Sequence, residues 1–311
     1  MAECYDVAII GGGVTGFSAA MYAGRFELKT AVFAETRGGT IVLSPAVENF
    51  PGFEKIVGFD LAEKIMNQAL KFGAELKDER VEKVEKKKDG GFALTTKRGE
   101  YCAKTVIFTT GTTWKKMGVP GEEKFSGKGV HYCALCDGAF YKGKVIGVVG
   151  SGDSAVKESL LLAGYGSKVY LLIRKDAPKA EPVNCRMLEA EKKVEVITKV
   201  TVREVKGGGQ EGMERVTGVL LDREVNGSRE LKLDGLFVAI GHEPLSGLAK
   251  SLGAKLNAKG EIVVNRDMET GVPGVYAAGD VVDSKFKQAA TGAGEGVTAV
   301  HSAYEYLKKK I

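Results

Sequence analysis

The sequence predicts an α/β protein built from two copies of one strand–turn–helix unit. Two short apolar runs, 5–10 and 145–149, are each followed by a glycine-rich turn and a helix-like stretch. The spacing of the copies is constant, because Gly150 of the second turn stands 139 residues (150 − 11) after Gly11 of the first. A buried-type strand that leads into a helix, and is then repeated, is typical of parallel sheets covered by helices.

The first copy runs from strand 5–10 through Gly11-Gly12-Gly13-Val14-Thr15-Gly16 into the helix-like stretch 17–24, and a second strand follows at 30–34. In this pattern the first glycine allows a tight turn, and the second lets the backbone approach a pyrophosphate. The third lets the helix pack closely on the strand. The helix N-terminus offers free N–H groups and the positive end of its dipole to phosphates. The turn therefore predicts dinucleotide binding.

The second copy runs from strand 145–149 through Gly150-Ser151-Gly152-Asp153-Ser154-Ala155 into the helix-like stretch 156–164, with a second strand at 168–173. Alanine replaces the third glycine and is still small. One such motif is a weak signal, but two that each stand between a strand and a helix are a strong one. We therefore expect two Rossmann-like dinucleotide-binding sites.

The residue that closes each second strand differs in charge between the copies. Glu35 closes the first and suits the ribose hydroxyls of FAD or NAD. The same offset gives Arg174, followed by Lys175, and cations there suit the 2′-phosphate of NADP. Ordinary surface charge at a strand end is the alternative for both positions.

Cys133 and Cys136 have the C-x-x-C spacing. This spacing permits a small disulfide ring and often accompanies a lowered thiol pKa. It is also half of a zinc site, but such a site needs two further Cys or His ligands, and the remaining ones are scattered. Asp137 follows the pair and suits proton transfer during thiol exchange, or it is simply a turn acid. We expect a redox pair and no metal.

Composition fits a chain of two domains, since 311 residues exceed one small core, and 44% apolar and 27% charged residues are ordinary for a soluble protein. No apolar run approaches the roughly 20 residues that span a bilayer. The N-terminus lacks a signal-peptide pattern, so we expect a cytoplasmic protein that binds no membrane. The 45 basic residues face 40 acidic ones and are spread out, so we expect no nucleic-acid partner. Cys4, Cys102 and Cys185 stand alone and are expected to be small apolar residues.

With these residues in view, the chain resembles the low-molecular-weight thioredoxin reductases over nearly its whole length. Glutathione-reductase-type flavoenzymes place their cysteine pair just after the first nucleotide motif, whereas here it stands just before the second. The motifs that carry the resemblance are 11–16, Gly38-Gly39-Thr40, 48–52, Thr109-Thr110-Gly111, 132–138, 150–155, 238–241, 276–280 and Lys287-Gln288-Ala289.

The resemblance implies two Rossmann-like domains, the second inserted into the first. The FAD-binding domain would comprise 1–114 and 243–311, and the NAD(P)-binding domain with the cysteine pair would comprise 115–242. Family members rotate the inserted domain, so both the nicotinamide and the cysteines reach one flavin. The hinge candidates are Gly111-Thr112-Thr113 and Gly241-His242-Glu243. A homodimer is also implied.

The resemblance also implies site residues. Cys136 would face the flavin, Cys133 would attack the disulfide of thioredoxin or a thioredoxin-like protein, and Asp137 would be the acid–base group. The residues implied for FAD are Gly11, Gly13, Thr15, Gly16, Glu35, Gly39, Thr40, Asn49, Val81, Gly111, Gly279, Asp280, Lys287, Gln288 and Ala289. Those implied for NAD(P) are Gly150, Gly152, Asp153, Ser154, Arg174, Lys175, Lys179, Ile240 and Gly241.

The chain departs from the family where NADPH is bound. NADPH-using members commonly carry a His-Arg-Arg run, whereas this chain has Ile173-Arg174-Lys175, with Lys179 in place of a later arginine. Lysine lacks the bidentate fork of arginine. NADPH is the expected donor, and NADH, a deazaflavin or ferredoxin are the alternatives. Two other functions are alternatives: a reductase that serves a peroxidase or another disulfide partner, and a non-catalytic flavin-binding protein.

Overall fold

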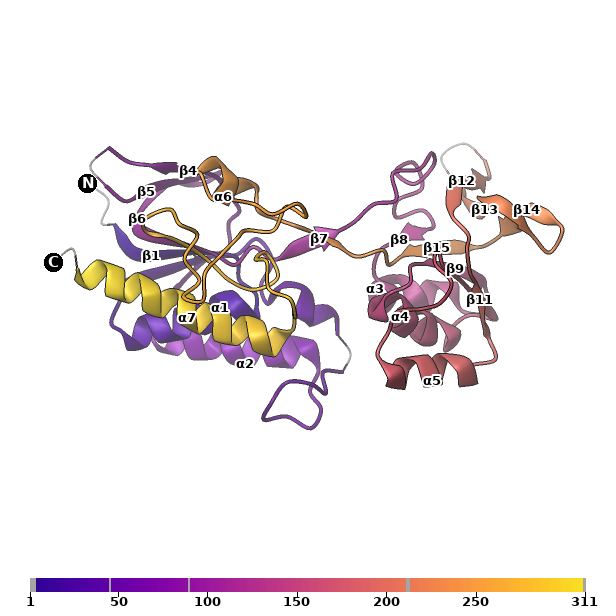
Figure 1. Cartoon of the computed structure of the whole chain (residues 1–311), viewed down its shortest axis with the longest axis horizontal. Coiled ribbons are helices and arrows are strands. Elements are labelled where there is room, and N and C mark those ends of the chain that lie inside the picture. The colour runs from indigo at the N-terminus through magenta and orange to yellow at the C-terminus, as the bar shows by residue number, and fades with distance from the viewer. Residues whose placement is uncertain (1–3, 45, 89, 211–212, 310–311) are drawn as a thin grey trace. The chain divides into compact units, whose positions relative to one another are not determined.

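The computed structural model describes residues 4–44, 46–88, 90–210 and 213–309. The chain separates into two compact units (Figure 1). The first comprises Met1–Thr113 and Glu243–Ile311, and the second, Trp114–His242, is inserted between these two segments. Each unit has a parallel sheet with helices against it, so the predicted α/β class with two Rossmann-like units is confirmed.

The sheet of the first unit is built around β1 (Tyr5–Ile10), which lies parallel to its neighbours β2 and β6. The strand order is β3-β2-β1-β6-β5-β4, and β17 pairs with β6. β4, β5 and β6 form an antiparallel meander at one end. The bounds of the other strands are β2 Thr30–Phe33, β3 Glu75–Lys77, β4 Val81–Lys86, β5 Phe92–Thr96, β6 Gly99–Phe108 and β17 Val275–Ala277.

Successive side chains of β1 point to opposite faces of this sheet, and both faces are buried. Val7 and Ile9 belong to a core formed with the helices, and Ala8 and Ile10 belong to a second core on the opposite face. From Val7 onward β1 is apolar at every position, which is typical of a strand in a parallel sheet covered on both sides. The helical elements of the unit are α1 Val14–Arg25, the 3₁₀ turn η1 Gly39–Leu43, α2 Gly58–Lys71, α6 Gly247–Ser251 and α7 Ala289–Lys308.

The second unit contains a five-stranded sheet of order β11-β10-β9-β15-β8, parallel throughout. A separate antiparallel sheet, β12-β13-β14, belongs to the same unit. The strands are β8 Val130–His131, β9 Val145–Val149, β10 Lys168–Leu172, β11 Val194–Ile197, β12 Val202–Gly208, β13 Arg215–Val225, β14 Ser228–Lys232 and β15 Gly235–Val238. The helical elements are α3 Ala134–Asp137, η2 Gly138–Tyr141, α4 Asp153–Ala163 and α5 Pro182–Ala190.

Two apolar clusters give this unit three layers. On one face of the parallel sheet, Ile146 and Val148 pack with Val156 and Leu162 of α4. On the other face, the parallel strands pack with β12 and β13 of the small sheet. The parallel strands are therefore buried on both sides, as their continuous apolar sequence predicts.

The chain passes from one unit to the other at two neighbouring strands. β7 (Thr112–Trp114) and β16 (His242–Pro244) pair as a two-stranded sheet, and the unit boundaries fall within them. Both hinge candidates overlap this pair in sequence. Gly111 and Gly241, directly before the two strands, have φ values of 64° and 106°.

The expectation for Cys4 and Cys102 was wrong. They form a disulfide with Cα atoms 4.7 Å apart, although 98 positions separate them in sequence. β1 and β6 run parallel with Tyr5 opposite Ala103, so the residues just before each are also opposite one another. Cys185 is a free, partly buried cysteine.

Among the helices of the described residues, none has an apolar stretch long enough to cross a membrane.

Candidate dinucleotide and disulfide sites

The first glycine-rich turn joins β1 to α1 as predicted. Gly11 has φ of 118°, and a Cβ atom there would collide with the carbonyl oxygen of Thr109. A Cβ at Gly16 would collide with the carbonyl oxygen of Gly11. Gly13 is the N-cap of α1 and bridges to Gly38, so a second glycine-rich segment lies against the turn. This side-chain-free turn at a helix N-terminus fits the pyrophosphate of a flavin dinucleotide.

The C-terminal segment of the first unit closes on the same turn. Gly279 follows β17 with φ of 80°, and a Cβ atom there would lie 2.6 Å from the hydroxyl oxygen of Thr15. The Gly279 N–H donates a hydrogen bond to Glu295 of α7 over 2.8 Å. Sequence reasoning missed Glu295, which holds this backbone in place from 16 residues further on. Thr15 and Gly279, both predicted site residues, are thus brought together.

Glu35 lies at the end of β2 and faces a small cavity of about 220 Å³. Its carboxylate accepts a hydrogen bond from Arg80 Nη1 at 3.2 Å, and Val81 directly after Arg80 is buried at the start of β4. Lys97 and Arg98 line the same cavity. Glu35 and Val81 are therefore near one another, and Arg80 is a neighbour that only the fold reveals.

The remaining residues predicted for FAD lie on loops and element ends of the first unit. Asn49 donates a hydrogen bond through Nδ2 to Gln288 Oε1 at 2.9 Å, which joins two motifs 239 positions apart. Gln288 also forms a capping box at the start of α7. Lys287 Nζ donates to the carbonyl oxygen of Asp280 at 2.9 Å, and Ala289 is the first residue of α7. Gly39 and Thr40 begin η1.

The second glycine-rich turn joins β9 to α4 in the same way. Gly150 has φ of 151°, and a Cβ atom there would collide with the carbonyl oxygen of Ala239. Gly152 is the N-cap of α4 and bridges to Lys179. Asp153 accepts hydrogen bonds from Asn184 Nδ2 at 2.7 Å and from the Glu181 amide at 3.0 Å. The turn is thus tied to the start of α5.

The cations predicted for a 2′-phosphate are all exposed. Arg174 and Lys175 follow β10, and within the described part of the chain neither makes an ion pair. Lys179 lies across from the turn, because its amide donates to the carbonyl oxygen of Ser151 at 2.6 Å. Exposed cations near a glycine turn fit an anionic ligand. The other predicted residues here are Ser154, which is exposed on α4, and Ile240 and Gly241, which follow β15.

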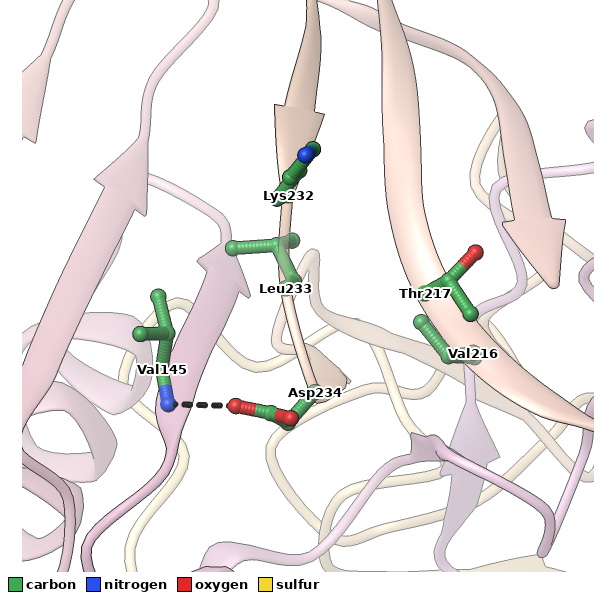
Figure 2. Close-up of a pocket in the computed structure, with 6 residues that line it drawn as sticks. All are labelled: Val145, Val216, Thr217, Lys232, Leu233 and Asp234. Carbon is green, nitrogen blue, oxygen red and sulfur yellow. Dashed lines mark hydrogen bonds between the residues drawn. The ribbon is translucent and has the colours of Figure 1, made fainter. Parts of the chain in front are cut away.

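A cavity of about 270 Å³ lies elsewhere in the second unit (Figure 2). Val145, the first residue of β9, lines it, and its amide donates a hydrogen bond to Asp234 at 2.8 Å. Lys232 and Leu233 also line it. Because Val145 begins the strand that Gly150 follows, this cavity is at the opposite end of the sheet from the glycine turn. Ligands of such sheets bind beyond the carboxyl ends of the strands, so we assign it no nucleotide.

Cys133 and Cys136 form a disulfide at the start of α3, with Cα atoms 5.4 Å apart. Cys133 is the N-cap of this short helix, and its sulfur accepts a hydrogen bond from the Cys136 amide at 3.2 Å. Cys136 is exposed and Cys133 is partly buried. The redox interpretation of the pair fits this geometry. The described residues contain no cluster of three His, Cys, Asp or Glu side chains that could hold a metal ion.

Asp137 directly after the pair has a partner that sequence reasoning missed. Its Oδ2 atom lies 3.0 Å from Nδ1 of His131. The sequence offers one signal of this partner, since His131 stands only two residues before Cys133.

Comparison with known proteins agrees with this geometry. Residues 5–296 match the family model described as pyridine nucleotide-disulphide oxidoreductase. A thioredoxin reductase of Bacillus subtilis (strain 168) is 40% identical, with 99% of this chain and 96% of that protein covered. The structure is similar to a Lactococcus lactis thioredoxin reductase, with a TM-score of 0.91, 33% identity, and 98% and 99% coverage of the two chains.

A ferredoxin-flavin thioredoxin reductase from Clostridium acetobutylicum is also similar, with a TM-score of 0.52 at 32% identity and 98% coverage of each chain. The resemblance found in the sequence is therefore confirmed, and the protein is a flavin-dependent oxidoreductase that acts on disulfides. The chain belongs to the pyridine nucleotide-disulphide oxidoreductase family and, within it, to the thioredoxin reductases.

Proposed function

We propose that this chain reduces the disulfide of thioredoxin or a thioredoxin-like protein, with electrons that pass from NADPH through FAD to the Cys133–Cys136 pair. The observation that carries the proposal is the disulfide itself, which lies in the unit that also holds the second glycine turn. The names of the similar proteins support thioredoxin as the partner. A homodimer and a cytoplasmic location stay predictions from the resemblance.

The first unit would hold FAD. Gly11, Gly13 and Gly16 would approach its pyrophosphate, and Glu35 would accept hydrogen bonds from the adenosine ribose. Gly279 and Asp280 would face the ribityl and pyrophosphate region, and the loops that carry the remaining predicted FAD residues would surround the rest of the molecule. When bound, FAD would supply a two-electron carrier between a nicotinamide and a disulfide.

The two cysteines have different surroundings, which supports different roles. A hydrogen bond donated to a sulfur favours its thiolate, and Cys133 receives one from the Cys136 amide. After reduction, the Cys133 thiolate would therefore attack the partner disulfide. Cys136, the exposed member, would receive electrons from the flavin side. Asp137 would hold or release the proton that thiol exchange requires.

NADPH is the proposed donor because Arg174, Lys175 and Lys179 place three exposed cations in the segment that follows β10. The alternative is another donor that feeds the same relay. The missing arginines favour that alternative, and so does the likeness to a ferredoxin-flavin enzyme. Anaerobic titration with NADPH, NADH, reduced deazaflavin and reduced ferredoxin, followed at the flavin absorbance band, separates these donors.

The disulfide relay is tested with Cys133→Ser and Cys136→Ser, and Cys185→Ser serves as the matched control because Cys185 is a free cysteine. We expect the effective donor to reduce the flavin of all three variants. Reduction of thioredoxin should fall to the background rate in the first two variants and stay at the wild-type rate in the control. Unchanged thioredoxin reduction in Cys136→Ser would contradict the proposal, as would purified protein that binds no flavin.

A further inference from the structure

We propose that His131 is a positioning residue for disulfide reduction, the middle member of a hydrogen-bonded chain Tyr141–His131–Asp137 that orients the acid–base carboxylate at the cysteine pair. The inference rests on the proposed function. It adds two residues, His131 and Tyr141, to a proton-transfer group that sequence reasoning confined to Asp137.

The geometry of this chain is direct. His131 Nδ1 lies 3.0 Å from Asp137 Oδ2, and His131 Nε2 lies 2.7 Å from the hydroxyl oxygen of Tyr141. The histidine side chain is 9% exposed and that of Asp137 is 32% exposed, so only the carboxylate end of the chain is open to solvent. All three residues come from one stretch, in β8, α3 and η2, which also contains both cysteines.

The hydrogen-bond directions follow from chemistry. A carboxylate only accepts, so Nδ1 carries the proton that faces Asp137. Nε2 of the neutral ring is then an acceptor, and the Tyr141 hydroxyl donates to it. Burial is the main reason that the pKa of Tyr141 is raised to about 12, so its hydroxyl stays protonated and remains a donor throughout the physiological range. Tyr141 therefore fixes the tautomer that His131 needs in order to hold Asp137.

The packing fixes the imidazole ring. His131 lies opposite Phe237 in the parallel pair β8–β15, and the two rings stack with centroids 5.2 Å apart. The Tyr141 ring packs edge-on against both. A Cβ atom at Gly235 would collide with the Tyr141 ring, so the glycine leaves the space that Tyr141 fills. A buried, stacked ring between two hydrogen bonds is suited to orient a carboxylate, as in other Asp–His pairs.

Charged groups act at both ends of this hydrogen-bonded chain. Asp137 contacts His131 directly, and Phe237 contributes no charge. Arg215, Asp137 and Asp234 act electrostatically on Tyr141, the first against the other two. Arg215 and Asp234 are therefore the charged groups at the Tyr141 end of the hydrogen-bonded chain.

The reduced pair begins as a Cys133 thiolate and a Cys136 thiol. Cys133 forms a mixed disulfide with the target and releases one target thiolate. Cys136 then gives its proton to Asp137 as its sulfur attacks Cys133, which reforms the Cys133–Cys136 disulfide and releases the second target sulfur. Asp137 passes the proton to one target thiolate, and the two electrons of the pair end on the target.

His131 serves this step by holding Asp137 in place. Asp137 accepts the Cys136 proton as a carboxylate, and the hydrogen bond donated by His131 Nδ1 fixes the direction in which that carboxylate points. The loss of His131 should therefore act only through Asp137, and this dependence distinguishes a positioning role from a packing role.

The experiment compares holoenzyme variants His131→Gln, Tyr141→Phe, Asp137→Asn and the double variant His131→Gln/Asp137→Asn. The readout is the pH profile of kcat/KM for the target disulfide, with His301→Gln, an exposed histidine of α7, as the matched control. Flavin reduction by the donor is measured separately and should be unchanged in all variants. If the flavin of the wild-type holoenzyme is not reduced by the donor, or if the wild type does not reduce the target disulfide, the result contradicts the proposed function. It does not then bear on the role of His131.

We expect His131→Gln to lower kcat/KM about tenfold, part of the roughly hundredfold or larger factor that general acid–base catalysis contributes. The shape of its pH profile should change toward that of Asp137→Asn. Tyr141→Phe, which keeps the ring, should change the profile less in the same direction, because the tautomer is no longer fixed. The double variant should match Asp137→Asn alone, because groups that act as one unit are not additive. A uniform fall in kcat/KM with an unchanged profile, or additive losses in the double variant, would overturn the inference.

Discussion

Two carboxylates on α4, five positions apart, have opposite surroundings. Burial disfavours the charge of Asp153, but hydrogen bonds from Lys157, the Glu181 amide and Asn184 outweigh it and lower its pKa. Glu158 has an oxygen, Oε2, that is buried and has no hydrogen-bond partner in the part of the chain that the structure describes. Burial raises the pKa of Glu158 to about 7. The number of partners, and not the residue type, decides which acid is ionised.

Replacement of Glu158 by Gln should therefore stabilise the protein above neutral pH. The folded-state pKa is above the unfolded value near 4.5, so ionisation of the unfolded chain removes stability from the wild type between about pH 4.5 and 7. The advantage of the variant should be absent near pH 4 and should reach a plateau of roughly 3 kcal/mol at most above pH 7. Thermal unfolding at pH 4.5 and pH 8 measures it. The exposed Glu189→Gln on α5 is the control and should show no such pH dependence.

Arg174→Ala should weaken NADPH more than NADH. A hydrogen bond between charged groups contributes about 1.5–3 kcal/mol, so the loss corresponds to roughly tenfold to a hundredfold in the affinity for NADPH. Kd values of both nucleotides, from quenching of protein fluorescence, test this expectation. Equal losses for NADPH and NADH would exclude a contact between Arg174 and the 2′-phosphate.

At the scale of elements, the local pattern was sufficient where strand, turn and helix follow directly in sequence. β1 and β9 have the predicted bounds, since an apolar run ends at a glycine turn in both. α1 and α4 begin three residues before the predicted starts, because the glycine N-caps pass straight into helix. β17 covers only the start of motif 276–280, since it ends at Ala277, just before the positive φ of Gly279.

Features that depend on strand register were not predictable from local pattern. The Cys4–Cys102 disulfide requires β1 and β6 to lie side by side in one register. The contact between Asn49 and Gln288, and the hydrogen bonds that Arg80 and Glu295 make with their distant partners, depend on the tertiary fold and were not predictable from local pattern either. The glycine turns and the cysteine pair were predictable because each is a short segment. His131 is also local, but its role depends on Tyr141 and Phe237, which only the fold places beside it.

The Cys4–Cys102 disulfide should stabilise the first unit, because it closes a loop of 98 positions in the unfolded chain. A disulfide typically contributes about 2–4 kcal/mol. We expect reductant to lower the Tm of the wild type. Cys102→Ser should have a Tm below that of the oxidised wild type, and reductant should not change it. Cys185→Ser should behave as the wild type. A wild-type Tm that is insensitive to reductant, with both thiols open to alkylation beforehand, would show that the bond does not form.

At the scale of the whole molecule, the chain crosses twice between two units through the paired strands β7 and β16. Both the nicotinamide site and the cysteine pair belong by proposal to the inserted unit, yet they must serve one flavin. The rotation inferred from the family resemblance would take place at these crossings. Gly111 and Gly241 have positive φ values that other residues rarely adopt.

Gly241→Ala should therefore lower kcat with thioredoxin, and its loss of stability should not account for the fall. Gly253→Ala is the matched control, since both glycines have φ near 100° and open space at the Cβ position, and Gly253 lies away from the crossings. The two variants should lose similar amounts of stability, on the order of 1 kcal/mol in the free energy of unfolding, and their Tm values should fall by similar amounts. Only Gly241→Ala should lower kcat. Equal kcat values for the two variants would contradict a hinge at this position.

The disulfide between Cys4 and Cys102 also changes how many electrons the protein can store. Each disulfide accepts two electrons. One is in the inserted unit and the other is in the first unit, so the disulfides of the described residues and a bound flavin would together make three separate two-electron acceptors. A reductive titration carried to completion should thus consume three equivalents of a two-electron reductant per chain, of which the catalytic relay uses two.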